Sequence, residues 1–331
     1  MSPAPIGVVF EDAELERSVR SGLDEVETGL RAAVRSDNEI LDISARHLVD
    51  AGGKRFRPLL TLLSSHFGDP GAPEIITAGV VVELTHLATL YHDDVMDEAL
   101  VRRGAASANA RWGNTVAILT GDFLFARASD LLADLGPAAV RLQARTFERL
   151  VTGQIRETVG PGEGEDPITH YLGVLAEKTG SLIATAAEFG AGFAGVEPST
   201  VDVLRRFGEQ IGVAFQISDD ILDIASDSVE SGKTPGTDLR EGVATLPVLY
   251  ALRSADAASA RLRELVSHPL VDDAEHAEAL ALLRASSALD DARRTLHSYA
   301  GAARSILVDL PDVPARAGFE ALTDRVIERT G

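Results

Sequence analysis

Three aspartates follow an apolar stretch near residue 90. In TLYHDDVMDEALVRRG, residues 89–104, Asp93, Asp94 and Asp97 come directly after a run with few polar positions. On a helix, Asp93 and Asp97 lie on one face, one turn apart. They also lie at the C-terminal end, where the macrodipole disfavours acidic groups. A single motif of this kind is typical of a solvated helix end, with the arginines that follow as counter-charges.

The same motif occurs a second time, which favours a functional role. HDDVMD at 92–97 is echoed by SDDILD at 218–223, again after apolar turns. On two facing core helices, the motifs would gather six carboxylates, which cannot all stay ionised without cations. Oxygen-only ligands suit hard divalent ions, above all Mg²⁺ together with substrate phosphate. The expected Mg²⁺ ligands are Asp93, Asp94, Asp97, Asp219, Asp220 and Asp223.

Basic residues stand close to these acids in the sequence. GGKRFRP at 52–58 offers three cations on a turn that its glycines permit. It is not a P-loop, because Lys54 is followed by Arg rather than by Ser or Thr. Each cation alone is more often a surface residue, but together, in a chain with only 31 Lys+Arg, they suggest that two anionic groups are held. The candidates are Lys54, Arg55, Arg57, Arg102, Arg103, Lys178 and Lys233.

Composition excludes several classes of protein. The 331 residues include 31 Lys+Arg against 51 Asp+Glu, a formal net charge of −20. Nucleic acid is therefore not an expected partner, because a phosphate backbone needs a basic surface. The chain has no cysteine, which excludes disulfides and thiolate metal sites. The start, MSPAPIGVVFEDAELE, lacks the basic region of a secretory signal, and IITAGVVV ends at Glu83, too short to span a bilayer. We expect a soluble, cytoplasmic protein without a transmembrane segment.

Periodicity places these motifs on helices. Apolar residues recur at three- and four-residue spacing, whereas the alternation typical of strands is scarce. We expect an all-α fold of more than ten helices in a single domain over 1–331, with 1–12 flexible. Two helices, at about 73–98 and 201–226, are apolar on most faces. They should lie in the middle of a helical bundle.

Five motifs in order carry a resemblance to a known family. GGKRFRP, HDDVMD followed by RRG, EKTG, FQISDDILD and GKTPGTDLREG resemble the trans-isoprenyl diphosphate synthases, of the medium- and long-chain (polyprenyl) type. The resemblance runs from about residue 40 to 255. It implies an all-α bundle around a deep cavity, a homodimer, and Mg²⁺-dependent 1′-4 condensation of isopentenyl diphosphate with an allylic diphosphate.

The resemblance also implies a role for each matching residue. Both aspartate triads would hold Mg²⁺, the first of them on the allylic diphosphate. That diphosphate would also contact Arg102, Lys178 and Lys233. The diphosphate of isopentenyl diphosphate would bind Lys54, Arg57, His86 and Arg103. The path of the carbocation would be lined by Thr179 and Gln216.

Two of these positions need comment. A histidine alone on an apolar helix is more often a core residue than a ligand. His86 is included because it stands two turns before Asp93 on nearly the same face and matches the family position. Many relatives carry a lysine where this chain has Val243, so one phosphate contact is missing.

The length of the product depends on the helix before the first triad. Ala88, five residues before Asp93, is small, whereas short-chain relatives carry a bulky aromatic residue near this position. From 73 to 93 the helix offers roughly 30 Å of wall for a growing tail. A medium or long polyprenyl chain, for a quinone side chain, is therefore expected. Phe123 and Phe125 could form a deeper floor, although ordinary core packing explains them equally well.

Three alternatives remain open. A geranylgeranyl diphosphate synthase would differ only in the depth of its cavity. A terpene cyclase also uses metal-bound acids in an α bundle, but it has no second diphosphate to bind and so no use for GGKRFRP and His86. A non-catalytic partner subunit of a heteromeric prenyl synthase would be expected to lack acids from one triad, and both are complete.

Overall fold

The computed structural model describes residues 7–225, 235–256 and 259–330. Within these ranges the only strands are the two short ones of a hairpin, β1 (Val101–Arg102) and β2 (Ala105–Ala106). More than ten α-helices make up most of the remainder, so the prediction of an all-α fold is confirmed.

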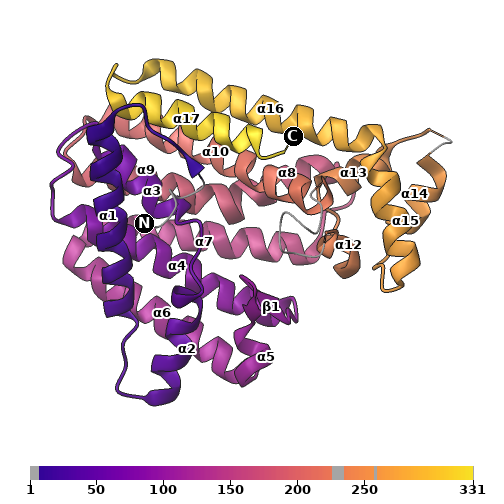
Figure 1. Cartoon of the computed structure of the whole chain (residues 1–331), viewed down its shortest axis with the longest axis horizontal. Helices are drawn as coiled ribbons and strands as arrows, with labels where there is room; N and C mark the ends of the chain where they lie inside the picture. The colour runs from indigo at the N-terminus through magenta and orange to yellow at the C-terminus, as the bar shows by residue number, and fades with distance from the viewer. Residues whose placement is uncertain (1–6, 226–234, 257–258, 331) are drawn as a thin grey trace. The chain divides into compact units, whose positions relative to one another are not determined.

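The helices follow one another with short connections (Figure 1). The first six are α1 (Ala13–Ala33), α2 (Glu39–Asp50), α3 (Phe56–Ser65), α4 (Glu74–Met96), α5 (Ala108–Trp112) and α6 (Asn114–Leu135). The next are α7 (Pro137–Val159), α8 (Pro167–Leu175), a π-helical turn η2 (Ala176–Gly180), α9 (Ser181–Phe193) and α10 (Pro198–Ala225). The last are α12 (Thr237–Glu241), α13 (Leu246–Arg253), α14 (Ala260–Leu265), α15 (Asp273–Arg284), α16 (Ser287–Ile306), a 3₁₀ turn η4 (Leu307–Asp309) and α17 (Pro314–Glu328).

Two compact units can be distinguished by their internal contacts. The first unit consists of Met1–Glu148, Leu182–Gly208 and Ile306–Leu322. The second unit consists of Arg149–Ser181, Glu209–Ser305 and Thr323–Gly331. Their boundaries fall inside α7, α10 and α17 rather than in loops. The expectation of a single domain therefore stays a prediction.

Helix α4 is the centre of the first unit. It packs against α1, α3 and α6, and it is buried along most of its length because apolar residues occupy almost every face (Figure 1). Small residues allow close approach: a Cβ at Gly79 would lie 2.9 Å from Val26 of α1, and one at Gly121 of α6 would lie 3.1 Å from the Ala88 carbonyl oxygen. The predicted boundaries of 73–98 agree with the observed helix to within two residues.

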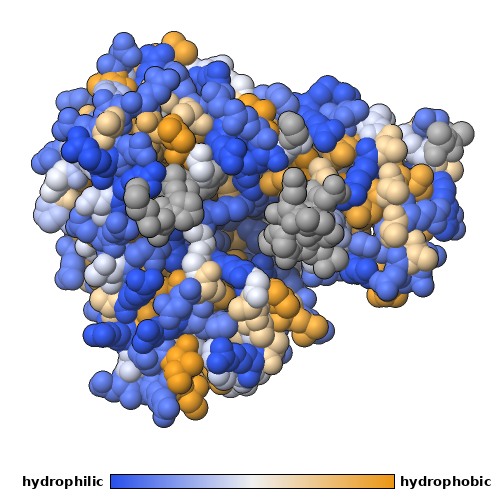
Figure 2. Space-filling model, viewed as in Figure 1, coloured by the Kyte–Doolittle hydropathy of each residue, from blue (hydrophilic) through white to orange (hydrophobic). Residues whose placement is uncertain are grey.

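The same helix is the one candidate for a membrane span in the described ranges, by length and composition. Its most apolar window is 67% buried inside the protein, as the core helix of a packed unit would be. Polar side chains dominate the molecular face drawn in Figure 2, with apolar residues in small separate groups. This agrees with a chain that carries 51 Asp+Glu.

Two apolar residues near the start of the chain are buried. Val8 and Phe10 are only 3% and 8% exposed. A Cβ at Gly318 of α17 would lie 3.1 Å from the Phe10 ring, so Phe10 packs on the first unit. Burial of these side chains contributes to stability. The expectation of a flexible start over 1–12 stays a prediction.

In the second unit, α14 and α15 form a helical hairpin beside α13 (Figure 1). The hairpin buries Leu262 and Leu265 from α14, and Leu283 and His276 from α15. A buried histidine among leucines needs a hydrogen-bond partner. That partner lies in the turn that follows the second aspartate triad.

Candidate active site

The first aspartate triad lies where α4 ends, in the first unit. Asp93 is partly buried, Asp97 is the exposed residue that caps the helix, and Asp94 is fully buried. Asp94 Oδ1 accepts a hydrogen bond from Arg102 Nε at 2.5 Å, whereas its Oδ2 has no hydrogen-bond partner among the residues that the structure describes. Burial raises the pKa of the Asp94 carboxyl, and the Arg102 charge opposes that rise.

The hairpin explains how Arg102 reaches back to Asp94. Val101 pairs with Ala106 and Arg102 with Ala105, and the two residues of the turn, Arg103 and Gly104, both have positive φ (53° and 77°). Such a turn matches the twist of two strands. Arg102 lies in β1, directly before this turn, so its pairing with Ala105 fixes the backbone from which Nε reaches the Asp94 carboxylate.

Arg103 joins this hairpin to the GGKRFRP turn. Its Nη1 donates to the carbonyl oxygen of Leu48 at 3.0 Å and also to that of Gly52. A Cβ at Gly53 would lie 2.9 Å from the guanidinium, so only glycine lets Arg103 approach this closely. Two motifs that the sequence separates by about fifty residues are thus held together by one side chain.

Three predicted binders of isopentenyl diphosphate share one electrostatic environment. Burial lowers the pKa of the Arg57 guanidinium to about 10, with Glu83 raising it and Arg103 lowering it. Burial also places the pKa of the His86 imidazole well below its usual value, and the charges of Arg57 and Arg103 lower it further. His86 is therefore neutral at pH 7, and its ring can offer one N–H donor. Lys54 lies on the surface of the same turn.

Arg55 and the buried Glu83 form an ion pair beside this group. Arg55 is 7% exposed and donates to Glu27 and, at 2.9 Å, to Glu83 Oε1. Its backbone has φ of 48°, an uncommon conformation for a residue other than glycine. The sequence shows Glu83 only as an interruption in an apolar run. A buried carboxylate on such a helix must have a cationic partner, which is a signal that sequence reasoning could have used.

The second triad lies near the C-terminal end of α10, in the second unit. Asp220 is buried, and its two carboxylate oxygens accept hydrogen bonds from Tyr171 Oη and from Gln216 Nε2, the latter at 3.1 Å. Burial raises the pKa of the Asp220 carboxyl to about 7, with the two hydrogen bonds opposing the rise. Asp219 forms an ion pair with Arg329, just beyond α17.

Asp223 is held by the turn that precedes α12. The backbone N–H groups of Thr237 and Asp238 each donate to its carboxylate at 3.3 Å. The N–H of Gly236 donates to its carbonyl oxygen at 2.7 Å. The Gly236 carbonyl oxygen is in turn 2.9 Å from Nε2 of the buried His276. Helix α15 therefore fixes the turn that orients the third acid.

Lys178 and Thr179 lie on the π-helical turn η2, a departure from α geometry that is frequent at functional sites. Lys178 Nζ is 2.5 Å from Glu157 Oε2, and Thr179 Oγ1 donates to Gln216 Oε1 at 3.4 Å. Gln216 thus contacts both Thr179 and Asp220, which joins three predicted site residues. Lys233 lies outside the described residues.

That Asp93, Asp94, Asp97, Asp219, Asp220 and Asp223 hold Mg²⁺ stays a prediction. Among the residues that the structure describes, no group of three or more His, Asp or Glu side chains is arranged to hold an ion. Arg102, Arg329 and Tyr171 contact acid oxygens that were expected to face metal. The chemistry still fits a hard divalent ion, because the donors are all oxygens and the buried Oδ2 of Asp94 lacks a partner. That the two triads face each other stays a prediction.

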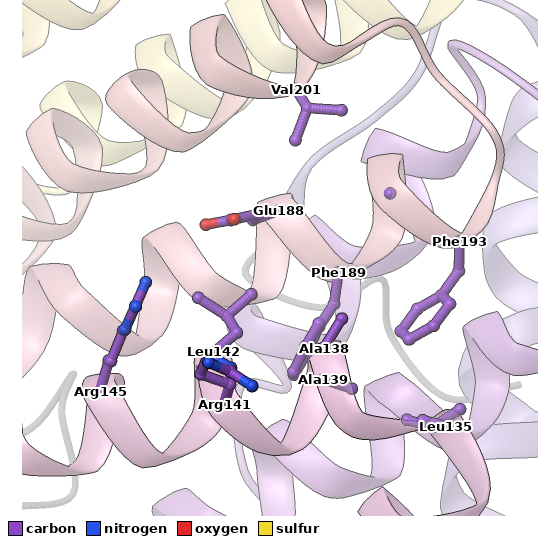
Figure 3. A pocket seen from close by; sticks show the side chains of 11 residues that line it. Leu135, Ala138, Ala139, Arg141, Leu142, Arg145, Glu188, Phe189, Phe193 and Val201 are labelled. Carbon is purple, nitrogen blue, oxygen red and sulfur yellow. The ribbon is translucent and has the colours of Figure 1, made fainter.

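Ala88, the predicted determinant of tail length, is fully buried in the core cluster of the first unit, which also contains Leu84, Tyr91 and Leu124. Phe125 packs on Phe147 with ring centroids 4.5 Å apart, as ordinary core packing would have it. The pocket that the structure describes in the first unit lies elsewhere. It is a groove of about 470 Å³ between α7, α9 and the start of α10 (Figure 3).

Comparison with known proteins identifies the family. A family model described as polyprenyl synthetase matches residues 38–283. The chain is 54% identical to the nonaprenyl diphosphate synthase of Mycobacterium tuberculosis, over all of this chain and 99% of that protein. It is 42% identical to the dimethylallyltranstransferase of the same organism, over 97% of this chain and 98% of that protein.

Solved structures agree. A geranylgeranyl pyrophosphate synthase from Corynebacterium glutamicum, complexed with calcium and isoprenyl diphosphate, superposes with a TM-score of 0.86 at 48% identity, covering 98% of this chain and 100% of that one. A decaprenyl diphosphate synthase from Rhodobacter capsulatus superposes with a TM-score of 0.86 at 33% identity, covering 96% of this chain and 99% of that one. Fold and relatives together define a prenyltransferase. The chain belongs to the polyprenyl synthetase family.

Proposed function

We propose that the protein is an all-trans polyprenyl diphosphate synthase that makes a medium- or long-chain product, for a quinone side chain. The observation that carries this proposal is the 54% identity to a nonaprenyl diphosphate synthase over the whole chain. The reaction joins C4 of isopentenyl diphosphate to C1′ of an allylic diphosphate. The C1′–O bond breaks and releases diphosphate, and a proton leaves C2 to give the new double bond.

The metal is proposed to be Mg²⁺, which would neutralise the leaving diphosphate. Asp93 and Asp97 suit it in the first unit because they share one face at the accessible end of α4. In the second unit, Asp219 and Asp223 suit the same ion. Asp94 and Asp220 are buried and hydrogen-bonded, and they would complete the two sets of ligands, Asp94 through the Oδ2 that has no partner among the described residues. A hard cation is supported by the oxygen-only donor set.

The basic residues are proposed to bind the two substrates. Arg57, Arg103 and neutral His86 would hold the diphosphate of isopentenyl diphosphate, since all three share one electropositive environment beside Asp93. Arg102 uses Nε for Asp94, so its two terminal nitrogens remain for the allylic diphosphate. The charge-assisted bonds of these guanidiniums position the reacting carbons, and the chemistry then follows from that geometry.

Gln216 and Thr179 are proposed to face the developing carbocation. Neither residue carries a charge, and their mutual hydrogen bond of 3.4 Å fixes the Gln216 carboxamide oxygen, an acceptor dipole suited to positive charge. The proton that leaves C2 is proposed to go to the departing diphosphate.

A geranylgeranyl diphosphate synthase is the second candidate. It is favoured by the C. glutamicum structure, at 48% identity. A homodimer in the cytoplasm is also proposed. The heptaprenyl diphosphate synthase component 2 of Geobacillus stearothermophilus, 38% identical over 88% of this chain, is by its name part of a two-component enzyme, so a heteromer is the alternative.

The deciding experiment uses the full chain, Mg²⁺, labelled isopentenyl diphosphate and allylic primers of increasing length. Products of more than four isoprene units would support the proposal. Accumulation of the four-unit product would favour the second candidate. Absence of any elongation by a folded protein with every primer would refute both, and gain of activity on adding a second polypeptide would show a heteromer. Chelation with EDTA should stop turnover, and Mg²⁺ should restore it.

A further inference from the structure

The pocket between α7, α9 and the start of α10, here called the α7–α9 pocket, has an apolar floor. Figure 3 shows Phe189 and Phe193 on α9 close to two leucines, Leu142 on α7 and Leu135 at the end of α6. Val201, on α10, lies on the opposite side of the pocket. Its volume of about 470 Å³ lies within the range of ligand sites, ~300–1,000 Å³. All of its lining residues belong to the first unit, and none carries a role in the proposed reaction.

Two arginines line one side of this pocket. Arg141 and Arg145 stand one turn apart on α7, both exposed, and neither has an ion-pair partner among the residues that the structure describes. Farther along the same helix, Arg149 pairs with Glu209 at 2.7 Å and Arg156 with Glu177 at 3.2 Å. The chain as a whole carries a net charge of −20, so these two adjacent cations form a local region of positive charge.

The position of the pocket on α7 adds to this positive charge. Pro137 is the first residue of the helix, and Ala138 and Ala139 of the first turn line the pocket. The N-terminal turn carries the positive end of the helix dipole and N–H groups without partners in the helix. Glu188, on the opposite wall, is half-buried, and burial raises the pKa of its carboxyl.

An apolar floor beside two guanidiniums suits an anionic amphiphile. Two arginines at i and i+4 lie about 5–6 Å apart at Cβ, so they can engage two linked phosphoryl groups, whereas one carboxylate would occupy only one of them. The two phenylalanine rings suit a branched hydrocarbon. Diphosphate at one end and an isoprenoid tail at the other are the features of the molecules that the proposed reaction makes.

We infer that the α7–α9 pocket binds one molecule of isoprenoid diphosphate, outside the aspartate triads, with its tail on Phe189 and Phe193 and its diphosphate on Arg141 and Arg145. This inference rests on the proposed function, because the occupant belongs to the isoprenoid diphosphates that the proposed reaction forms and elongates. Binding here needs no metal, since the anion is held by arginines. A product retained in this pocket gives the chain a means of sensing product concentration apart from competition with the primer.

Gly192 provides a direct way to close the pocket. It lines the pocket on α9, and a Cβ built on it meets no atom within 4 Å. Gly192→Phe should therefore fill the groove without strain. Gly301 on α16 is a matched control, because it is also exposed, helical and without an atom within 4 Å of an added Cβ.

The test is calorimetric titration with geranylgeranyl thiolodiphosphate, an unreactive analogue, in Mg²⁺ and in EDTA. The wild-type chain should bind one equivalent that requires Mg²⁺ and a second that does not. Gly192→Phe and the double variant Arg141→Ala/Arg145→Ala should weaken the metal-independent event by about tenfold or more. Gly301→Phe, and Arg35→Ala on another exposed and unpaired arginine, should leave it unchanged.

Several outcomes would overturn the inference. These are a single, Mg²⁺-dependent event in the wild-type chain, a Gly192→Phe titration like the wild type, or displacement of the analogue by equimolar palmitate, which would assign the pocket to fatty acids. The proposed function is tested separately by elongation of primers. Normal elongation with one binding event would refute only the pocket, whereas two binding events without elongation would refute only the synthase.

Discussion

Arg329 lies over the ring of Phe215, with its Cζ 5.0 Å from the ring centroid, and forms an ion pair with Asp219. Arg329 is 11% exposed, and one of its terminal nitrogens, Nη1, is buried without a hydrogen-bond partner in the described part of the chain. An arginine from the end of the chain thus supplies positive charge to an acid of the second triad. A divalent ion bound to Asp219 would take over that role.

Arg329→Gln should therefore change how strongly the protein depends on metal. Without metal, loss of the ion pair should destabilise the fold by about 1–2 kcal/mol, since the Asp219 side chain is about one-third exposed and partly screened. With Mg²⁺, the competing cation is gone, and metal should bind more tightly. Thermal melts in EDTA and in Mg²⁺ measure both effects. The rise in Tm on adding Mg²⁺ should be larger in the variant than in the wild type, and an equal rise in both would show that Arg329 and metal do not compete.

Asp220 predicts a pH dependence of stability in the metal-free protein. Its pKa is raised from 3.8 to about 7, so between these values the folded protein holds a proton that the unfolded chain has released. Stability therefore falls as pH rises from about 4 to 7 and stays low above that range. Asp220→Asn should remove this slope and be more stable than the wild type at pH 8, by up to a few kcal/mol.

Denaturant unfolding in EDTA at pH 5 and pH 8 measures this difference. Asp134→Asn, a change at an exposed acid of α6, is the control and should follow the wild type. Tyr171→Phe should be less stable than the wild type at both pH values, because it lacks a hydrogen bond to the buried carboxyl. A steeper pH slope in Asp220→Asn than in the wild type would contradict the assignment.

His276 should act on Asp223 through the turn between them. In His276→Leu the Gly236 carbonyl oxygen loses the contact with Nε2 and keeps the longer one with the Arg240 N–H, at 3.3 Å. The amides of Thr237 and Asp238 should therefore exchange faster with deuterium, and a higher Mg²⁺ concentration should be needed for activity. His276→Asn keeps a donor, so it should partly restore the slow amide exchange and the normal Mg²⁺ requirement. Leu283→Ala destabilises the same helix without touching the turn. It should lower Tm but leave amide exchange in the turn and the Mg²⁺ requirement unchanged. Unchanged exchange at residues 235–241 in His276→Leu would rule out the link.

The sequence predicted those parts of the molecule that follow from local patterns. Three- and four-residue periodicity predicts helices directly, and the predicted 201–226 compares with α10 at Pro198–Ala225. The repeated DDxxD motif and GGKRFRP were found because the chemistry of each is contained in a few adjacent residues. The β1–β2 hairpin was missed, because Arg103, unlike Gly104, is not a residue type that predicts positive φ.

Partners from distant parts of the chain could not be predicted in this way. Tyr171, His276 and Arg329 are each separated from the acid they serve by about 50 to 110 residues. Nothing in their local sequence indicates that role, and only packing brings them to the second triad. The pairing of Asp94 with Arg102 could not be predicted either. Whether the Asp94 carboxylate contacts a metal ion or an arginine depends on the direction of one side chain.

Ala88 connects the structure most directly to the length of the product. Ala88→Phe adds a ring to a fully buried position, beside the close approach of Gly121 to the Ala88 carbonyl. If the added ring enters the channel of the growing tail, products should become several isoprene units shorter while consumption of primer continues. Each further unit gains about 0.8 kcal/mol per buried CH₂, so space rather than affinity should set the stopping point.

The competing expectation for Ala88→Phe is an overpacked core. That outcome costs about 1–3 kcal/mol of stability and leaves product length unchanged. Product sizing together with a thermal melt separates the two. Ala78→Phe, also fully buried on α4 but nearly three turns farther from the triad, is the matched control. Shorter products from Ala88→Phe but not from Ala78→Phe would place the tail beside Ala88. A lowered Tm with wild-type product lengths would place Ala88 in the core alone, and the length of the product would then have to be set by another part of the chain.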